Sequence, residues 1–135
     1  MKKVNLYFGI FLFLLFLATG YYMEEYFKPE NLDKHVMRMQ IRASHIYILF
    51  ISLLNILAFK INLSVKKPVL KYVDILFRIV LIAAGILSVF AFSIEHTGDL
   101  SKRSWTLLAV VLSLIAVGLM LLNVILNQKR EKKSI

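Results

Sequence analysis

Apolar residues occur in four long runs along the chain, separated by short segments that carry most of the charge. The runs cover about residues 4–22, 43–63, 73–94 and 105–126. A helix needs roughly 20 apolar residues to cross the hydrocarbon core of a bilayer, and each run approaches that length. Only helices fit, because backbone amides in lipid must bond within their own segment and no run alternates as a barrel strand does. The pattern therefore predicts one all-α domain over residues 1–135, an integral membrane four-helix bundle.

The composition supports a membrane protein. Hydrophobic residues make up 59% of the chain, and the mean hydropathy is +0.73. Soluble domains contain roughly 45–50% apolar residues, and a small domain has too little interior to hide a larger share. The absence of cysteine excludes disulfides and thiolate metal sites. The net charge of +9 comes from residues between the apolar runs, so it is read as a topology signal and no nucleic-acid partner is expected.

Basic residues collect on one predicted side of the membrane. That side holds Lys2, Lys3, Lys60, Lys66, Lys67, Lys71, Lys129, Arg130, Lys132 and Lys133. On the other side, basic residues are balanced by Glu24, Glu25, Glu30, Asp33, Glu95 and Asp99. The positive-inside rule then places both termini in the cytoplasm, with the basic tail 127–135 as an anchor. The chain looks broadly like many small four-helix membrane proteins of bacteria, which suggests the bacterial cytoplasmic (inner) membrane but implies no functional residues.

The first run has an alternative interpretation. Lys2 and Lys3, the apolar stretch and the small residues Ala18-Thr19-Gly20 also fit a secretory signal peptide with its cleavage point. Cleavage would leave three spans in the same orientation. The length of the apolar run favours a membrane span.

A polar stripe precedes and enters the second span. His35, Arg38, Arg42 and His45 fall within an arc of about 80° on a helix that turns about 100° per residue. We therefore expect an amphipathic helix that begins near Asp33 on the outer side and continues directly into the span.

The segment between spans three and four lies on the same predicted side as this stripe. It offers Glu95 as a counter-charge, and an ionisable group at the membrane boundary is costly unless it is paired or hydrated. We therefore expect an Arg42–Glu95 contact, with His45 and His96 at similar depth. The candidate ligand- or partner-binding residues are Arg38, Arg42, His45, Glu95, His96 and Arg103.

Three functions fit this cluster. The first is an interaction, assembly or lipid-binding protein, whose partner is lipid, another membrane protein or a second copy. The second is a redox component, in which His45 and His96 bind haem and Arg38 and Arg42 pair with its propionates, or the same groups bind a quinone. The third is a small transporter, although the first span lacks the carboxylate on which small multidrug exporters depend. No convergent catalytic set or dedicated metal site is apparent, so we do not expect an enzyme.

Two further patterns have structural explanations. Asp74 and Arg78 are four residues apart and predict an ion pair on one helix face, with a proton relay as the alternative. Small residues in spans three and four predict close helix packing. They are Gly85, Ser88, Ala109, Ser113, Ala116 and Gly118.

Overall fold

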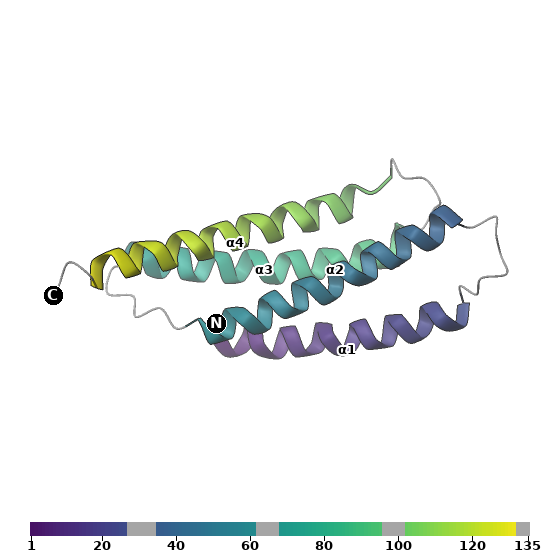
Figure 1. Cartoon of the computed structure of the whole chain (residues 1–135), viewed down its shortest axis with the longest axis horizontal. Helices are drawn as coiled ribbons and strands as arrows, with labels where there is room; N and C mark the ends of the chain where they lie inside the picture. Colours follow the sequence, from purple (N-terminus) through teal and green to yellow (C-terminus); the bar gives the residue numbers. More distant parts are fainter. Residues whose placement is uncertain (27–34, 62–67, 96–101, 132–135) are drawn as a thin grey trace.

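The computed structural model describes residues 1–26, 35–61, 68–95 and 102–131. These residues form four α-helices: α1 (Lys2–Tyr26), α2 (His35–Lys60), α3 (Pro68–Ile94) and α4 (Ser104–Glu131), shown in Figure 1. Each helix is long and apolar enough to cross a membrane. The predicted all-helical architecture, with four helices of membrane-spanning length and composition, is thus confirmed.

The helices extend beyond the apolar runs that predicted them. α2 begins at His35, so the amphipathic segment and the second span form one continuous helix, as expected. α3 begins at Pro68, a residue whose fixed φ and missing amide hydrogen suit the first helical position. The run at 4–22 also lies within one uninterrupted helix, α1.

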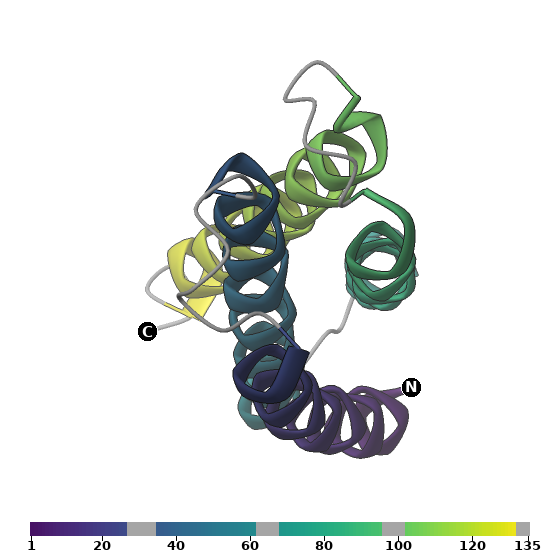
Figure 2. The ribbon, with the colours of Figure 1, turned by 90° about the vertical axis from the view of Figure 1, so that its right-hand side faces the viewer.

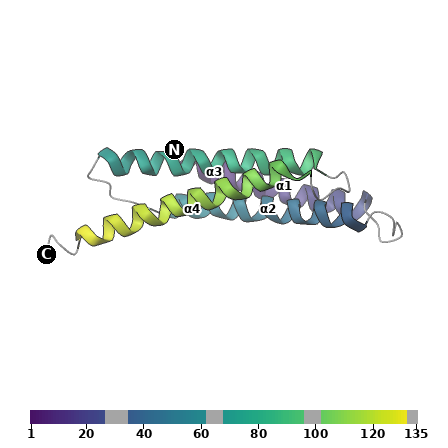
Figure 3. The same cartoon turned by 90° about the horizontal axis from the view of Figure 1, so that it is seen from above.

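The four helices are arranged as two hairpins. α1 packs along α2 and α3 packs along α4, each pair antiparallel (Figures 1 and 3). α2 and α3 form the main contact between the hairpins, whereas α1 and α4 do not touch each other. The view along the helices shows α1 and α4 at opposite edges of the bundle (Figure 2). We call the boundary between the α1–α2 and α3–α4 hairpins the hairpin seam.

Close packing within the bundle relies on small residues. A Cβ atom on Gly9 of α1 would lie 2.8 Å from the Ile56 side chain, and one on Gly85 of α3 would lie 2.6 Å from Phe8. Ser88, Ala109, Ser113 and Ala116 are buried, as predicted. Gly118 differs, because it is exposed and nothing lies within 4 Å of the position its Cβ would take.

The outward surfaces of the helices are apolar along most of their length. Large exposed side chains include Leu14 of α1, Ile86 of α3 and Leu114 of α4. Such surfaces are stable in lipid and unfavourable in water. The buried charged and amide side chains, by contrast, lie toward the two ends of the bundle, with buried serines between them.

Candidate functional site

Two polar clusters lie at opposite ends of the bundle. The inner cluster contains Asn5, Asn55, Asp74 and Arg78, close to the beginning of α1 and the end of α2. The outer cluster contains Ser44, Glu95, Arg103 and Thr106, close to the end of α3 and the beginning of α4. The names inner and outer follow the predicted topology.

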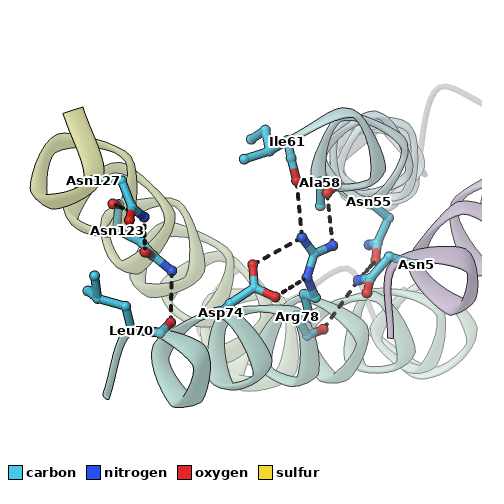
Figure 4. Close-up of polar contacts among 9 residues, drawn as sticks. All are labelled: Asn5, Asn55, Ala58, Ile61, Leu70, Asp74, Arg78, Asn123 and Asn127. Atoms are coloured by element: carbon cyan, nitrogen blue, oxygen red, sulfur yellow. Dashed lines mark hydrogen bonds and ion pairs between the residues drawn. The ribbon is translucent and has the colours of Figure 1, made fainter. Parts of the chain in front are cut away.

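Arg78 is the centre of the inner cluster and is fully buried. Its Nε donates to Asp74 Oδ2 at 3.0 Å and its Nη2 to Asp74 Oδ1 at 3.1 Å, so the predicted ion pair is confirmed as a two-bond contact. The guanidinium also crosses to α2, where Nη1 donates to the carbonyl of Ala58 at 2.8 Å and Nη2 to that of Ile61 at 3.4 Å (Figure 4). Carbonyls in the last turn of a helix lack intrahelical partners and carry partial negative charge. Arg78 therefore donates hydrogen bonds both to the carboxylate of Asp74 in its own helix and to the carbonyls at the end of α2.

Two buried asparagines connect α1 to this arginine. Asn55 Nδ2 donates to the carbonyl of Ile51 at 3.0 Å, which turns Asn55 Oδ1 toward α1. Asn5 Nδ2 donates to that oxygen at 2.9 Å and to the carbonyl of Arg78 at 3.3 Å (Figure 4). The two backbone carbonyls thus fix the orientation of both amides, and Asn5 Oδ1 remains buried without a partner.

α4 is tied to α3 at the same end of the bundle. Asn123 Nδ2 donates to the carbonyl of Leu70 at 3.2 Å, and Asn127 Nδ2 donates to Asn123 Oδ1 at 2.9 Å (Figure 4). Every helix therefore contributes a polar side chain near the inner end. This concentration is typical of polar residues that join helices in a membrane.

Glu95 organises the outer cluster by capping α4. Its Oε1 accepts from the amide of Trp105 at 2.6 Å, and its Oε2 accepts from the amide of Thr106 at 3.0 Å. The Thr106 hydroxyl also donates to Oε2 at 2.5 Å. The first amides of a helix need acceptors, and a carboxylate there also interacts favourably with the helix dipole.

The expected Arg42–Glu95 contact is therefore wrong. Both Glu95 oxygens are used by the beginning of α4, while Arg42 is exposed. In the part of the chain that the structure describes, the ion pair within 4.0 Å is that of Asp74 and Arg78. The Glu95 carboxylate accepts hydrogen bonds from the first amides of α4, which have no partner within their own helix, and does not reach across to α2.

Arg103 joins the beginning of α4 to α2. Its Nη2 donates to Ser44 Oγ at 3.1 Å, to Thr106 Oγ1 at 3.4 Å and to the carbonyl of Gln40 at 3.5 Å. Its Nε is buried and has no hydrogen-bond partner. This guanidinium therefore meets neutral oxygens, and one of its donors is unused.

His45 points toward α1. Its ring stacks on Phe16 with centroids 4.1 Å apart, and its Nδ1 lies 2.9 Å from Thr19 Oγ1. The Thr19 hydroxyl already donates to the carbonyl of Phe16 at 3.0 Å, so it accepts from an Nδ1–H of His45. The Cε1 and Nε2 atoms lie over Gly20, where a Cβ would be 3.3 and 3.6 Å away. The ring is thus an interhelical contact.

The structure divides the predicted cluster between two sides of α2. Residues two positions apart on a helix point about 200° apart, so Arg42 lies on nearly the opposite side of α2 from Ser44, which meets Arg103. Arg38, Arg42 and His45 share the other side, and His96 lies outside the described residues.

Several residues of these clusters were not singled out from the sequence. Asn5 and Asn123 are isolated amides in otherwise apolar runs, a signal that could have found them. Ser44 and Thr106 gave no such signal, because short hydroxyl side chains are common in membrane helices.

Among the described residues, no group of three or more His, Cys, Asp or Glu side chains is placed to hold a metal ion. Comparisons with family models, curated proteins and solved structures found no match to this chain. Haem and quinone binding at His45 and His96 remain predictions of the sequence.

Proposed function

We propose that this chain is a small integral membrane protein of the bacterial cytoplasmic membrane that acts by binding a partner. Both termini lie in the cytoplasm in this proposal, and the outer end of α2 presents Arg38 and Arg42 to acidic side chains of another membrane protein. We call the surface formed by these two arginines the outer cationic surface.

The exposure of Arg42 carries the proposal. Glu95, the acidic residue that the sequence predicted as its counter-charge, uses both oxygens to cap α4. Arg42 is exposed, and Arg38, four residues earlier on the same side of α2, is half-buried. Two guanidinium groups one helical turn apart match carboxylates well, because each arginine can donate two parallel hydrogen bonds.

The hairpin arrangement supports a binding role as well. α1 and α4 lie at opposite edges and do not contact each other, so both keep long apolar faces available to neighbouring helices. A partner could combine apolar packing against α1 with acidic contacts to the outer cationic surface, since His45 places that side of α2 next to α1.

Native mass spectrometry after gentle extraction tests this function. We expect a bound partner protein in the wild type, its loss in Arg42→Glu and its retention in Lys71→Glu. Lys71 is a matched control because it is an exposed cation near the opposite end of the bundle. Retention of the partner in both variants, or its loss from both, would contradict the proposal.

A further inference from the structure

Three exposed lysines lie at the inner end of the bundle, one on each of α1, α2 and α3. Lys3 is two residues before Asn5, Lys60 is the last residue of α2, and Lys71 is two helical turns before Arg78. The hydrogen bonds of Asn5 and Arg78 bring these three helices together (Figure 4). We call the surface formed by Lys3, Lys60 and Lys71 the inner lysine surface.

The inner lysine surface lacks a counter-charge among the described residues. Asp74 uses both of its oxygens on Arg78. The carbonyls of Ala58 and Ile61, which flank Lys60 at the end of α2, also accept hydrogen bonds from Arg78. Within the described ranges, none of the three lysine ammonium groups forms an ion pair or a side-chain hydrogen bond. Their positive charge is therefore available to anionic groups outside the chain.

We propose that the inner lysine surface binds the headgroups of anionic phospholipids in the adjacent leaflet. The lysine ammonium groups contact phosphate oxygens at the membrane surface, while the acyl chains stay in the bilayer around the helices, so the contact requires no cavity in the protein. In the predicted topology this is the cytoplasmic leaflet, whose anionic lipids attract basic segments. The proposal concerns the opposite end of the bundle from the outer cationic surface and does not depend on the partner proposed there.

Neighbouring residues place these lysines at the depth of the headgroups. Tyr7 of α1 and Tyr72 of α3 are exposed, and tyrosine is enriched where the membrane meets water. Leu57, one turn before Lys60 on α2, is exposed and apolar, as suits contact with acyl chains. A lysine stem lies along such apolar surface while its ammonium group reaches the polar layer.

The chemistry of the surface favours phospholipids over an acidic protein. A lysine ammonium is a compact, strongly hydrated point charge on a flexible stem, whereas arginine is better suited to binding a carboxylate through two parallel bonds. The outer cationic surface consists of arginines and the inner surface of lysines. Three separate charges on three helices match several mobile headgroups better than one fixed pair of carboxylates.

Lipid titration followed by native mass spectrometry tests the proposal. Detergent-solubilised protein is titrated at low salt with phosphatidylglycerol or with phosphatidylcholine of the same acyl chains. We expect tighter binding of phosphatidylglycerol. Its affinity should fall about fivefold in Lys60→Gln and again in Lys71→Gln, the effect of losing the attraction between one basic residue and an anionic surface. The affinity for phosphatidylcholine should stay the same.

Lys102→Gln is the matched control, because Lys102 is an exposed lysine just before α4 at the outer end. We expect it to change the phosphatidylglycerol affinity by less than about twofold, within the range of a surface charge pair. A variant that combines Lys3→Arg, Lys60→Arg and Lys71→Arg keeps all three charges and should keep the affinity. Equal binding of the two lipids, equal losses in the inner and outer lysine variants, or a loss in the arginine variant would overturn the proposal.

This proposal and the proposed function can fail separately. Lys71→Glu reverses a charge at the inner end, so it should weaken phosphatidylglycerol binding and keep the protein partner, whereas Arg42→Glu should do the opposite. Circular dichroism checks that each variant folds, as expected for substitutions of exposed residues. A protein that is lost from Lys71→Glu while phosphatidylglycerol binding is unchanged would show that the inner lysine surface binds a protein, and would overturn the lipid proposal.

Discussion

Arg78 and Arg103 both cross the hairpin seam to α2, and the difference between their surroundings distinguishes the two ends of the bundle. Arg78 is fully buried, and all three of its nitrogens donate hydrogen bonds to a carboxylate and to helix-end carbonyls. Arg103 is half-buried, meets neutral oxygens and keeps Nε unpaired. All the nitrogens of the inner arginine are hydrogen-bonded within the protein, whereas the outer one keeps a buried donor without a partner.

Burial explains why the two ends differ. Removing a charge from water carries a large free-energy penalty, which only close pairing and complete hydrogen bonding offset. The inner cluster provides both through Asp74 and the carbonyls of α2. In the outer cluster, the carboxylate of Glu95 instead accepts hydrogen bonds from the amides at the beginning of α4. We therefore expect the inner end to contribute most to stability, and the proposed partner binding uses the outer end.

The largest effect on stability is expected from Asp74→Ala. This change leaves the buried guanidinium of Arg78 without its counter-charge, which costs about 3–5 kcal/mol when one partner of a buried pair is removed. Reversible unfolding in mixed micelles measures the loss. Glu25→Ala removes an exposed carboxylate as a control, and a similar small loss in both variants would contradict the role of the inner cluster.

A smaller effect is expected from Glu95→Ala. The first amides of α4 lose their acceptor, which costs about 1–2 kcal/mol as in other helix caps. Hydrogen exchange at Trp105 and Thr106 should accelerate in this variant, while exchange in the middle of α4 stays slow. If both amides keep their protection, Glu95 does not cap the helix in solution.

Asn55→Ala should cost about 1 kcal/mol, because interhelical hydrogen bonds in membranes contribute roughly 0.6–1.7 kcal/mol. The variant loses the bond from Asn5 and leaves that amide partly unpaired. Mixed-micelle unfolding against Ser93→Ala, which removes an exposed hydroxyl bonded within its own helix, isolates the interhelical part. Equal losses in the two variants would refute an interhelical contribution from Asn55.

The smallest effect on stability is expected from Arg42→Ala, within about 0.5 kcal/mol, as for most exposed substitutions. Its unfolding curve should match that of the wild type while partner binding is lost. A large loss of stability would show that Arg42 belongs to the fold and would weaken the distinction between the two ends.

The sequence predicted the features that depend on local spacing. Span length follows from bilayer thickness, and Asp74 and Arg78 lie one turn apart on any α-helix, so both predictions hold. The pairing of Arg42 with Glu95 depended instead on which side of α2 faces α1 and which faces α4. A single sequence does not reveal how α2 is rotated about its own axis. The sequence analysis therefore grouped His45, Glu95 and Arg103 in one cluster, although their side chains contact α1, α4 and α2 respectively.

The role of Glu95 shows a second limit. A capping residue is normally sought just before the helix it serves, and Glu95 lies well upstream of α4. Only the folding back of the chain brings its carboxylate to the amides of Trp105 and Thr106. Asn5 depended on folding in the same way, because its partners Asn55 and Arg78 come from two other helices.

The central claim is that the outer cationic surface and the inner cluster face opposite sides of the membrane. The chain has no cysteine, so single cysteines at Arg42 and Lys71 can be labelled in intact cells with a membrane-impermeant maleimide. We predict that position 42 reacts at once and position 71 only after the membrane is permeabilised. Labelling of both positions from the same side, or of position 71 alone in intact cells, would contradict the account.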